Sequence, residues 1–455
     1  MKKQHPPNSN ADNTHSRKRE PASPESQVPS RESRSFLIKH SRLLDPAGDF
    51  DGIATLGVRD GRVDYRGSRA PRARYDEVID AKGLWLMPGV VDLCARLREP
   101  GATYKANMQS ESPAALAAGI TALCIPPDTR PVIDNAAVVV RVNRIAKAAA
   151  GAHVYMLGAL TQNLAGDALA EMSALQQAGC VGVSNALAPL ASSRVARRAL
   201  EYASSLGLTV HVVPQDAALA NGGCAHEGAV ALRLGLPAIP VAAETLAIRQ
   251  WLSLVEDSGA RIHFGRLSSA RGAELIATAK ARGLPVSADV AAHQLFLTED
   301  DIEGFDAQSH VLPPLRTAQD RDALRAAVAS GVIDAICSDH QPHERDAKIN
   351  PFPLTEPGIS ALETLLPLSL RLVGNGILTP LQMAQRLTAA PARILGINGG
   401  SLAVGSRADL LLIDPLREWV LEPEEMLSRG HNTPFAGRTF RGRVQQCFRG
   451  SRRGL

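Results

Sequence analysis

The sequence predicts an α/β protein built on a (β/α)8 barrel, with a small β domain formed by both ends of the chain. Through the middle of the chain, short apolar runs alternate with Ala- and Leu-rich segments of helical period. There are eight such runs, one for each strand of a barrel. The two ends instead carry strand-like runs separated by turn residues. A doubly wound open sheet is the alternative architecture for the middle of the chain.

The first part of the chain, residues 1–35, is rich in Ser, Pro, Asn and charged side chains. Such a segment buries too little apolar surface to offset the entropy of ordering, so we expect a disordered basic tail. It lacks the apolar centre of a secretion signal, and Asp12, Glu20, Glu25 and Glu32 argue against a transit peptide. No long apolar stretch follows anywhere in the chain, so we expect a cytoplasmic protein without a membrane span.

The predicted β domain combines residues 36–87 with residues 398–455. Asp60-Gly61, set between apolar alternations, is typical of a hairpin turn. The two ends therefore form one small composite β-sandwich, and the barrel of residues 88–397 is inserted between them. The strand-like runs of the two ends cover residues 35–44, 52–67, 407–415, 418–423 and 438–450.

The barrel strands are predicted from short apolar runs, as expected of parallel strands buried on both faces. Segments of helical period separate them, for example residues 167–179 and 269–283. The predicted strands cover residues 89–95, 119–126, 153–159, 180–186, 208–213, 261–266, 285–290 and 332–339.

Composition excludes several classes of function. The formal net charge of +4 is small for 455 residues and gives no indication of binding to nucleic acid or to an anionic membrane. The 6 Cys include no CxxC pair, so neither a disulfide framework nor a zinc finger is indicated. The 12 His would suffice for a metalloenzyme, and their positions decide that question.

Polar residues stand where the predicted barrel strands end, which is where the active sites of such barrels lie. Any one of them is equally well explained as a polar residue satisfied by its neighbours. Together they predict a functional site or the remnant of one. They are Cys94, Arg96, Asp128, Asn185, His211, Arg266, His293 and Asp339.

A family resemblance starts at residues 88–101, PGVVDLCARLREPG. This segment resembles the first-strand motif of the dihydroorotases, in the cyclic amidohydrolase superfamily, whose usual form is PG-hydrophobic-D-x-H-x-H-x-R-E-P-G. The similarity runs from about residue 36 to the C-terminus and implies an amidohydrolase-type barrel with a β domain. Further matching segments, in the family's order, are residues 125–135, 269–301, 312–324, 333–343, 358–368 and 431–442.

The resemblance identifies the positions that ligate metal in the family. Two of them keep their chemistry, His211 and Asp339, the latter also being the family's proton shuttle. Arginine offers no lone pair and stays protonated, so Arg96 and Arg266 would repel a divalent ion. We therefore expect no cofactor, or zinc only if the chain is an enzyme after all. The six family positions are Cys94, Arg96, Asn185, His211, Arg266 and Asp339.

Positions that bind substrate in the family are partly altered. Arg98 and His343 are retained, although Arg98 is equally well explained as a brace for its own loop. Asp128 and Leu312 replace asparagines of the family. We expect Arg96 and Arg266 to take over the charge of the lost metal by pairing with Asp339 and Asp128, because an unpaired buried carboxylate is costly.

The resemblance is strongest to degenerate dihydroorotase homologues that lack the zinc ligands. These are non-catalytic chains that hold aspartate carbamoyltransferase in its active assembly, in de novo pyrimidine biosynthesis. The resemblance thus implies a structural subunit, a hetero-oligomer and the aspartate carbamoyltransferase catalytic chain as partner. One alternative is an active dihydroorotase, interconverting dihydroorotate and N-carbamoyl-aspartate with a reduced metal site. The other is an anion-binding sensor that uses Arg98 and His343.

Overall fold

The computed structural model describes residues 35–450 in full and Arg452 and Arg453 by their backbone. The predicted tail of residues 1–35 lies, apart from Ser35, outside the described residues. Within this part of the chain, none of the helices has both the length and the apolar composition needed to cross a bilayer.

The middle of the chain forms a parallel barrel that is nearly closed. Its strands are paired in chain order from first to last, which excludes the doubly wound alternative, and a bridge between Ala95 and His340 links the last strand's end to the first. Each strand overlaps one of the predicted runs, so the barrel prediction is confirmed. The strands are β6 (Val90–Asp92), β7 (Ile120–Ile125), β8 (His153–Ala159), β9 (Gly182–Ser184), β10 (Val210–Val212), β13 (Ile262–Phe264), β14 (Val286–Ala291) and β15 (Ala335–Cys337).

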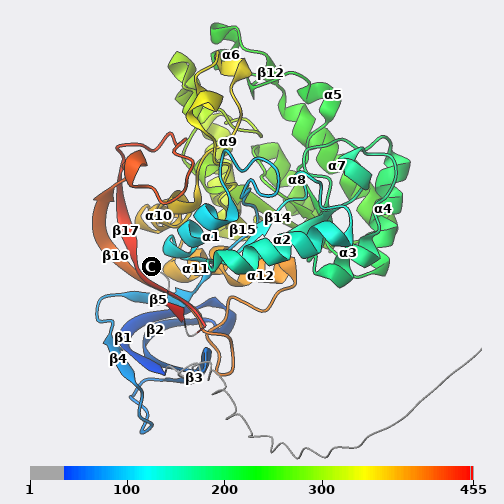
Figure 1. Cartoon of the computed structure of the whole chain (residues 1–455). Helices are drawn as coiled ribbons and strands as arrows, with labels where there is room; N and C mark the ends of the chain where they lie inside the picture. The colour runs from blue at the N-terminus through cyan, green and yellow to red at the C-terminus, as the bar shows by residue number, and fades with distance from the viewer. Residues whose placement is uncertain (1–34, 451, 454–455) are drawn as a thin grey trace, which may run out of the picture. The chain divides into compact units, whose positions relative to one another are not determined.

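Helices surround the barrel strands (Figure 1). Most of the longer ones begin at an Asn, Ser or Thr whose side chain accepts a backbone N–H of the first turn, which stabilises the helix start. The segment predicted at residues 269–283 is confirmed as α8, whereas the segment at residues 167–179 becomes helical only from Met172. The helices are α1 (Met108–Ala117), α2 (Ala136–Ala149), α3 (Met172–Ala178), α4 (Ser193–Ser205), α5 (Ala217–Ala220), α6 (Ala229–Leu234), α7 (Val241–Ser258), α8 (Ala270–Ala281), α9 (Ala318–Ser330), α10 (Leu362–Gly374), α11 (Pro380–Leu387) and α12 (Ala389–Leu395).

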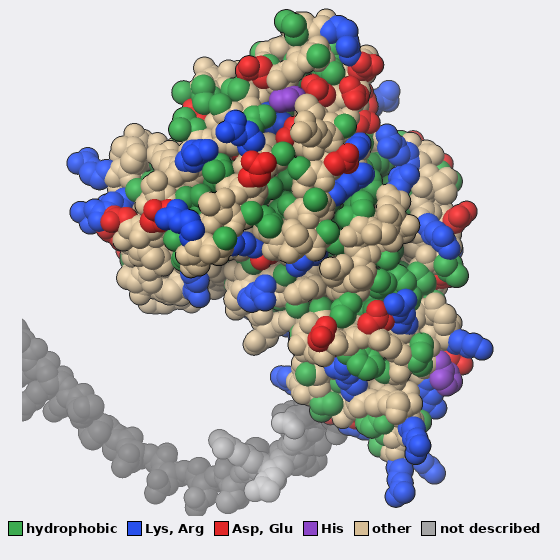
Figure 2. All heavy atoms as spheres, turned by 180° about the vertical axis from the view of Figure 1, so that it is seen from behind, with side chains coloured by type: hydrophobic (Ala, Val, Ile, Leu, Met, Phe, Trp, Pro, Cys, Tyr) green, Lys and Arg blue, Asp and Glu red, His purple; other side chains and the backbone are tan. Residues whose placement is uncertain are grey.

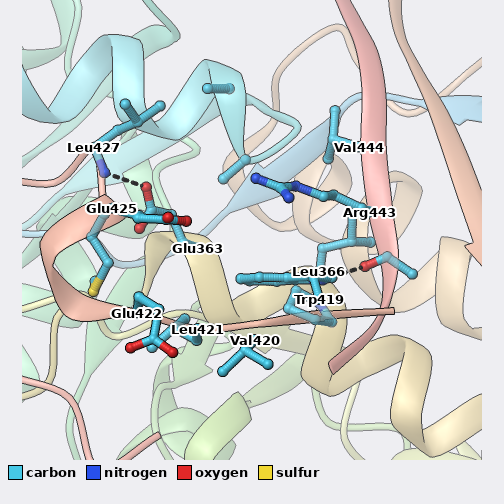
Figure 3. A pocket seen from close by; sticks show the side chains of 15 residues that line it. Glu363, Leu366, Trp419, Val420, Leu421, Glu422, Glu425, Leu427, Arg443 and Val444 are labelled. Atoms are coloured by element: carbon cyan, nitrogen blue, oxygen red, sulfur yellow. Dashed lines mark hydrogen bonds between the residues drawn. The ribbon is translucent and has the colours of Figure 1, made fainter. Parts of the chain in front are cut away.

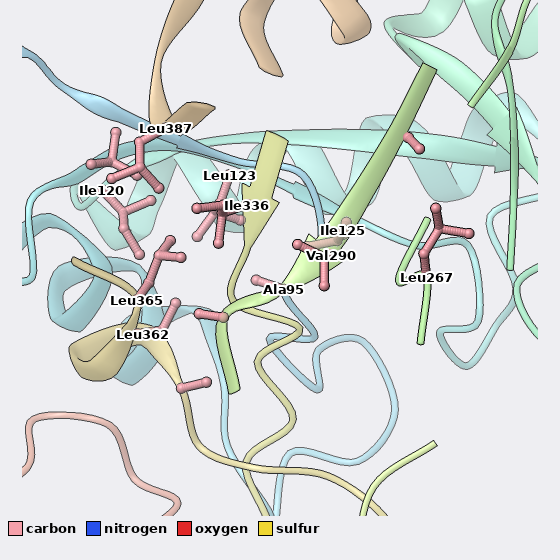
Figure 4. Close-up of a cluster of buried hydrophobic side chains, with 14 of the residues drawn as sticks. Ala95, Ile120, Leu123, Ile125, Leu267, Val290, Ile336, Leu362, Leu365 and Leu387 are labelled. Atoms are coloured by element: carbon pink, nitrogen blue, oxygen red, sulfur yellow. The ribbon is translucent and has the colours of Figure 1, made fainter. Parts of the chain in front are cut away.

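The main hydrophobic core joins barrel strands to helices. Ile120 and Leu123 of β7 lie near Leu365 of α10 and Leu387 of α11, all almost fully buried (Figure 4). Burial of the strands, between the helices outside and the side chains inside the barrel, explains why the predicted runs are mainly apolar.

The two ends of the chain share a second sheet. Its strand order is β18-β17-β16-β5-β1-β2-β3, with β4 also paired to β1, so strands from the C-terminal end join those of the N-terminal end through β5. The predicted hairpin is confirmed, because Asp60 and Gly61 both have positive φ, at 52° and 73°. The strands are β1 (Phe36–Asp45), β2 (Phe50–Arg59), β3 (Arg62–Gly67), β4 (Glu77–Asp80), β5 (Trp85–Pro88), β16 (Asp409–Val420), β17 (Thr439–Arg449) and β18 (Arg452–Arg453).

One strand prediction was wrong. The runs at residues 407–415 and 418–423 form a single strand, β16, whose pairing with β17 shifts register between Asp414 and Glu418. Pro415 lies in that interval and has no N–H to donate, so the ladder is interrupted there while the strand continues.

This sheet curls around its own core. Phe36 of β1 and Phe448 of β17 are three strand positions apart, which in a flat sheet would separate them by about 14 Å. Their rings stack with centroids 4.6 Å apart. The composite β-sandwich expected from the two chain ends is thus formed by one continuous, strongly curved sheet, whose inner face buries Ile38, Leu56 and Leu410.

The surface carries charges of both signs. On the face seen in Figure 2, Lys and Arg side chains are interspersed with Asp and Glu, without a wide field of one sign. This distribution agrees with the small formal net charge of the chain.

Candidate functional site

All six family metal positions lie at the barrel mouth, after or within strands β6, β9, β10, β13 and β15. Arg266 and Asp339 have positive φ, at 58° and 47°, so the chain turns sharply as it leaves β13 and passes β15. All six side chains belong to buried residues. Their exposed fractions are 3% for Cys94, 9% for Arg96, 5% for Asn185, 6% for His211, 8% for Arg266 and 2% for Asp339.

Two arginines, two carboxylates and a thiol lie together at the barrel mouth, and we call these five side chains the arginine plug. Arg266 Nη1 lies 2.8 Å from Cys94 Sγ, and Arg266 Nε lies 3.6 Å from Asp339 Oδ1. Arg96 Nη1 lies 3.5 Å from the same Asp339 oxygen. Arg96 also donates from Nε to Asp128 Oδ2 at 3.0 Å, and its Nη2 lies 2.9 Å from that oxygen. The expected ion pairs are thus present.

The arginine plug balances its own charge. Two guanidinium groups face two carboxylates, so the ionised groups sum to zero without a metal ion. Burial raises the pKa of the Cys94 thiol to about 12, although the neighbouring Arg266 acts in the opposite direction. Cys94 is therefore a protonated thiol at neutral pH in the metal-free protein, and it would have to lose this proton to act as a metal ligand.

The remaining two positions do not complete a ligand set. Asn185 is occupied locally, since its Oδ1 accepts Thr161 Oγ1 at 2.8 Å and its Nδ2 donates to the Ala188 carbonyl at 3.0 Å. His211 Nε2 is buried without a hydrogen-bond partner, and burial holds the pKa of His211 well below its usual range. Burial likewise lowers the pKa of His293, to about 4.

The space left at the barrel mouth is small. A cavity of about 20 Å³ is lined by Cys94, His211, His263, Arg266 and Asp289 among others. That volume accommodates about one water molecule. Among the described residues, no three or more His, Cys, Asp and Glu side chains are grouped as a metal would require. The residues here do not fit a divalent ion.

The retained substrate positions hold each other and the loops around them. Arg98 donates from Nε to the Pro342 carbonyl at 3.0 Å, and its Nη2 lies 3.0 Å from His343 Nε2. Burial lowers the pKa of Arg98 to about 10. Leu312 packs with Ala220 and Ile239, so the structure does not bring it to the arginine plug. The contacts of Arg98 are those of a loop brace.

Sequence reasoning missed a buried network around Glu111, on helix α1. Ala361 N donates to His340 Nδ1 at 3.0 Å, so His340 carries its proton on Nε2 and donates it to Glu111 at 2.9 Å. Ser428 Oγ and Arg429 N also donate to Glu111, at 2.7 and 3.0 Å. The network joins α1, the segment after β15 and the C-terminal end. The sequence signal for it is a glutamate among the buried residues of α1, beside Met108 and Ala115.

A second cavity, of about 270 Å³, lies away from the barrel mouth between α10, β16 and β17 (Figure 3). Glu363 lines it and accepts the Leu427 N–H at 2.7 Å. Burial raises the pKa of Glu363 to about 7. The cavity is also lined by Leu366, Trp419 and Arg443, with Arg443 over the Trp419 ring.

Glu363→Gln is expected to make the protein less sensitive to pH. A carboxyl whose pKa is raised on folding binds its proton more tightly when folded, so stability falls as pH rises from about 4.5 to about 7. Glutamine keeps the acceptor for Leu427 but has no proton to lose. Chemical denaturation at pH 5 and pH 8 measures how far the free energy of unfolding falls between the two pH values. In Glu363→Gln this fall should be smaller than in the wild type by about 2 kcal/mol. An unchanged difference would contradict the raised pKa.

The chain is similar in sequence and in structure to known amidohydrolases. Residues 85–453 match the amidohydrolase family. A dihydroorotase-like protein of Pseudomonas putida is 49% identical over 411 residues, covering 90% of this chain and 97% of the relative. A dihydroorotase of Anaeromyxobacter dehalogenans is 42% identical over 419 residues, covering 92% and 97%. The solved L-hydantoinase (dihydropyrimidinase) from Arthrobacter aurescens superposes with a TM-score of 0.83 at 25% identity, covering 92% of this chain and 95% of that one.

Proposed function

We propose that this chain, which belongs to the amidohydrolase family and is dihydroorotase-like, is a non-catalytic member of that family. In this proposal it serves as a structural subunit. The observation that supports this most directly is the arginine plug. Arg96 and Arg266 stand where the family binds metal, and both pair with Asp339.

The chemistry of amide hydrolysis explains why the arginine plug argues against catalysis. Attack on a cyclic amide needs a hydroxide equivalent at neutral pH, which a metal ion generates by lowering the pKa of bound water. Nothing at this site offers that activation, because the guanidinium groups are permanent cations without lone pairs. Asp339 is held between two of them, and the cavity beside it accommodates about one water.

The proposed partner is the aspartate carbamoyltransferase catalytic chain, in a hetero-oligomer of de novo pyrimidine biosynthesis. This part of the proposal rests on the resemblance to degenerate homologues that lack the same zinc ligands. Retention of the whole barrel with its β domain, despite the altered metal positions, supports a role that depends on the fold and its surface.

Two measurements on the purified chain test the loss of catalysis. Elemental analysis after purification with zinc in all buffers should give well under one zinc per chain. A dihydroorotase assay, run in both directions, should give no turnover above buffer. Turnover that tracks bound zinc would instead establish the active enzyme with a reduced metal site.

Native co-purification tests the partner. A tagged chain, expressed in its own host, should carry aspartate carbamoyltransferase activity with it in a high-mass peak on size exclusion. A chain that elutes alone, with the transcarbamoylase activity elsewhere, would refute the structural-subunit proposal while leaving the loss of catalysis standing.

A further inference from the structure

The cavity of about 270 Å³ between α10, β16 and β17 has two chemically different sides (Figure 3). One side carries carboxylates, and the other carries apolar side chains together with Arg443. None of its lining residues belongs to the arginine plug or to the family's substrate positions. The carboxylates are those of Glu363, Glu422 and Glu425, and the apolar side chains include those of Leu366, Trp419 and Val444.

Carboxylates outnumber cations around this cavity. Glu422 and Glu425 are exposed, whereas Glu363 is partly buried. Arg443 is the cation on the cavity wall, and it lies over the Trp419 ring, with its Cζ 5.3 Å from the ring centroid. Within residues 35–450, none of the three glutamates forms an ion pair with Arg443 or with another side chain. A ligand of positive charge would therefore meet carboxylates that are not already paired.

Glu363 is the most buried of the three carboxylates. Its Oε1 accepts the Leu427 N–H at 2.7 Å. A carboxylate has about four acceptor sites, so this bond leaves acceptor capacity for a ligand. Burial raises the pKa of Glu363 to about 7, and Glu111 on α1 acts in the same direction, whereas the backbone of residues 427 and 428 and Arg443 act against it. The ionised form of Glu363 thus lacks a counter-ion, which an ammonium group would supply.

The apolar part of the cavity is held in place by the fold and is partly open to solvent. The Trp419 indole Nε1 donates to the Gly442 carbonyl at 3.0 Å, which fixes the ring. Val420 and Leu427, which also line the cavity, are 42% and 55% exposed, so apolar surface remains for a ligand to cover. This surface favours a ligand with a hydrocarbon part, and a wall that is already ordered costs little binding energy.

We propose that this cavity binds a small aliphatic amine in its ammonium form, with the ammonium group at Glu363 and the hydrocarbon chain against Leu366 and Trp419. Such a cation supplies the charge that the carboxylates lack and covers the apolar wall at the same time. The volume of about 270 Å³ is close to the lower limit of about 300 Å³ for small-molecule sites, which suits a small ligand. The inference does not rest on the proposed function, since neither the arginine plug nor a partner chain takes part.

Isothermal titration of the full-length chain at pH 8 tests the proposal with matched probes. Hexylamine carries both groups, methylamine lacks the hydrocarbon chain, and 1-hexanol lacks the charge. Hexylamine should bind at least about tenfold more tightly than either, because each analogue loses one of the two contacts. Equal affinities, or no heat from hexylamine at millimolar concentrations, would overturn the proposal. Tighter binding of Nα-acetyl-L-lysine methylamide than of hexylamine would also overturn it, because the cavity would then fit a lysine side chain of another protein.

The variant Glu363→Gln locates the ammonium group. Between pH 6 and pH 8 the wild-type affinity for hexylamine should rise about tenfold, because Glu363 loses its proton over this range. Glu363→Gln keeps the acceptor for Leu427, so it should fold normally, bind hexylamine at least about tenfold more weakly at pH 8 and lose the pH dependence. Glu256→Gln, which changes an exposed glutamate paired with Arg282, should leave the affinity unchanged. Wild-type affinity or an unchanged pH dependence in Glu363→Gln would show that hexylamine binds elsewhere.

Discussion

Asp339→Ala should lower the free energy of unfolding by about 3–5 kcal/mol, because it leaves two buried guanidinium groups facing each other without their shared carboxylate. Arg96 Nη1 and Arg266 Nε both lie within 3.6 Å of the same Asp339 oxygen. Urea denaturation at pH 7 followed by circular dichroism measures the change.

Asp128→Asn is the matched control for Asp339→Ala. Asp128 also pairs with Arg96, but its side chain is 31% exposed against 2% for Asp339. Water can therefore replace the lost carboxylate, and the cost should be about 1 kcal/mol. Similar costs at the two positions would show that the arginine plug is not held by buried charge.

Metal affinity should rise from undetectable to tight in the triple variant Cys94→His, Arg96→His, Arg266→His. Each guanidinium about 4 Å from a divalent ion repels it by roughly 8 kcal/mol at an effective dielectric near 20. The variant removes both cations and adds neutral nitrogen donors beside His211 and Asp339. Elemental analysis should give about one zinc per chain, against well under one in the wild type.

The single variant Cys94→His tests whether zinc is excluded by the charge of the arginines or by the small number of ligands. It adds a donor but keeps Arg96 and Arg266, so it should bind no zinc. A single variant that binds zinc as well as the triple variant would mean that the arginines do not exclude metal. A triple variant that folds, as judged by circular dichroism, yet binds no zinc would mean that the backbone no longer holds the ligand positions in place.

Much of the fold could be predicted because local pattern and tertiary burial agree. The barrel strands are largely buried on both faces, so they appear in the sequence as short, mainly apolar runs. The pairs of Arg96 and Arg266 with Asp339 could be predicted too, because parallel strands end at one face of a barrel and bring these residues together. The order of the strands in the barrel is thus enough to predict that these three residues lie close together.

Other features depend on contacts that no local pattern encodes. Glu111 meets His340 across 229 residues, and its role follows from four donors that converge on one carboxylate. A third cavity, of about 590 Å³, is lined by Gln308, the segment 343–349 and the segment 423–432, each of ordinary polar composition. The sequence predicts two strands in place of β16, because Pro415 is typical of a strand end. The structure has one strand, because the partner strand β17 continues past this residue.

The curved sheet shared by the two chain ends has a consequence for biosynthesis. Strand β5 ends at Pro88, but β16, which covers its open edge, begins at Asp409. At about 5–20 residues per second, a ribosome needs tens of seconds to supply that partner. Throughout this interval the nascent chain presents an uncovered edge at Trp85–Pro88, a template for unwanted pairing with other chains. The last strands to be translated therefore close the first structure to emerge.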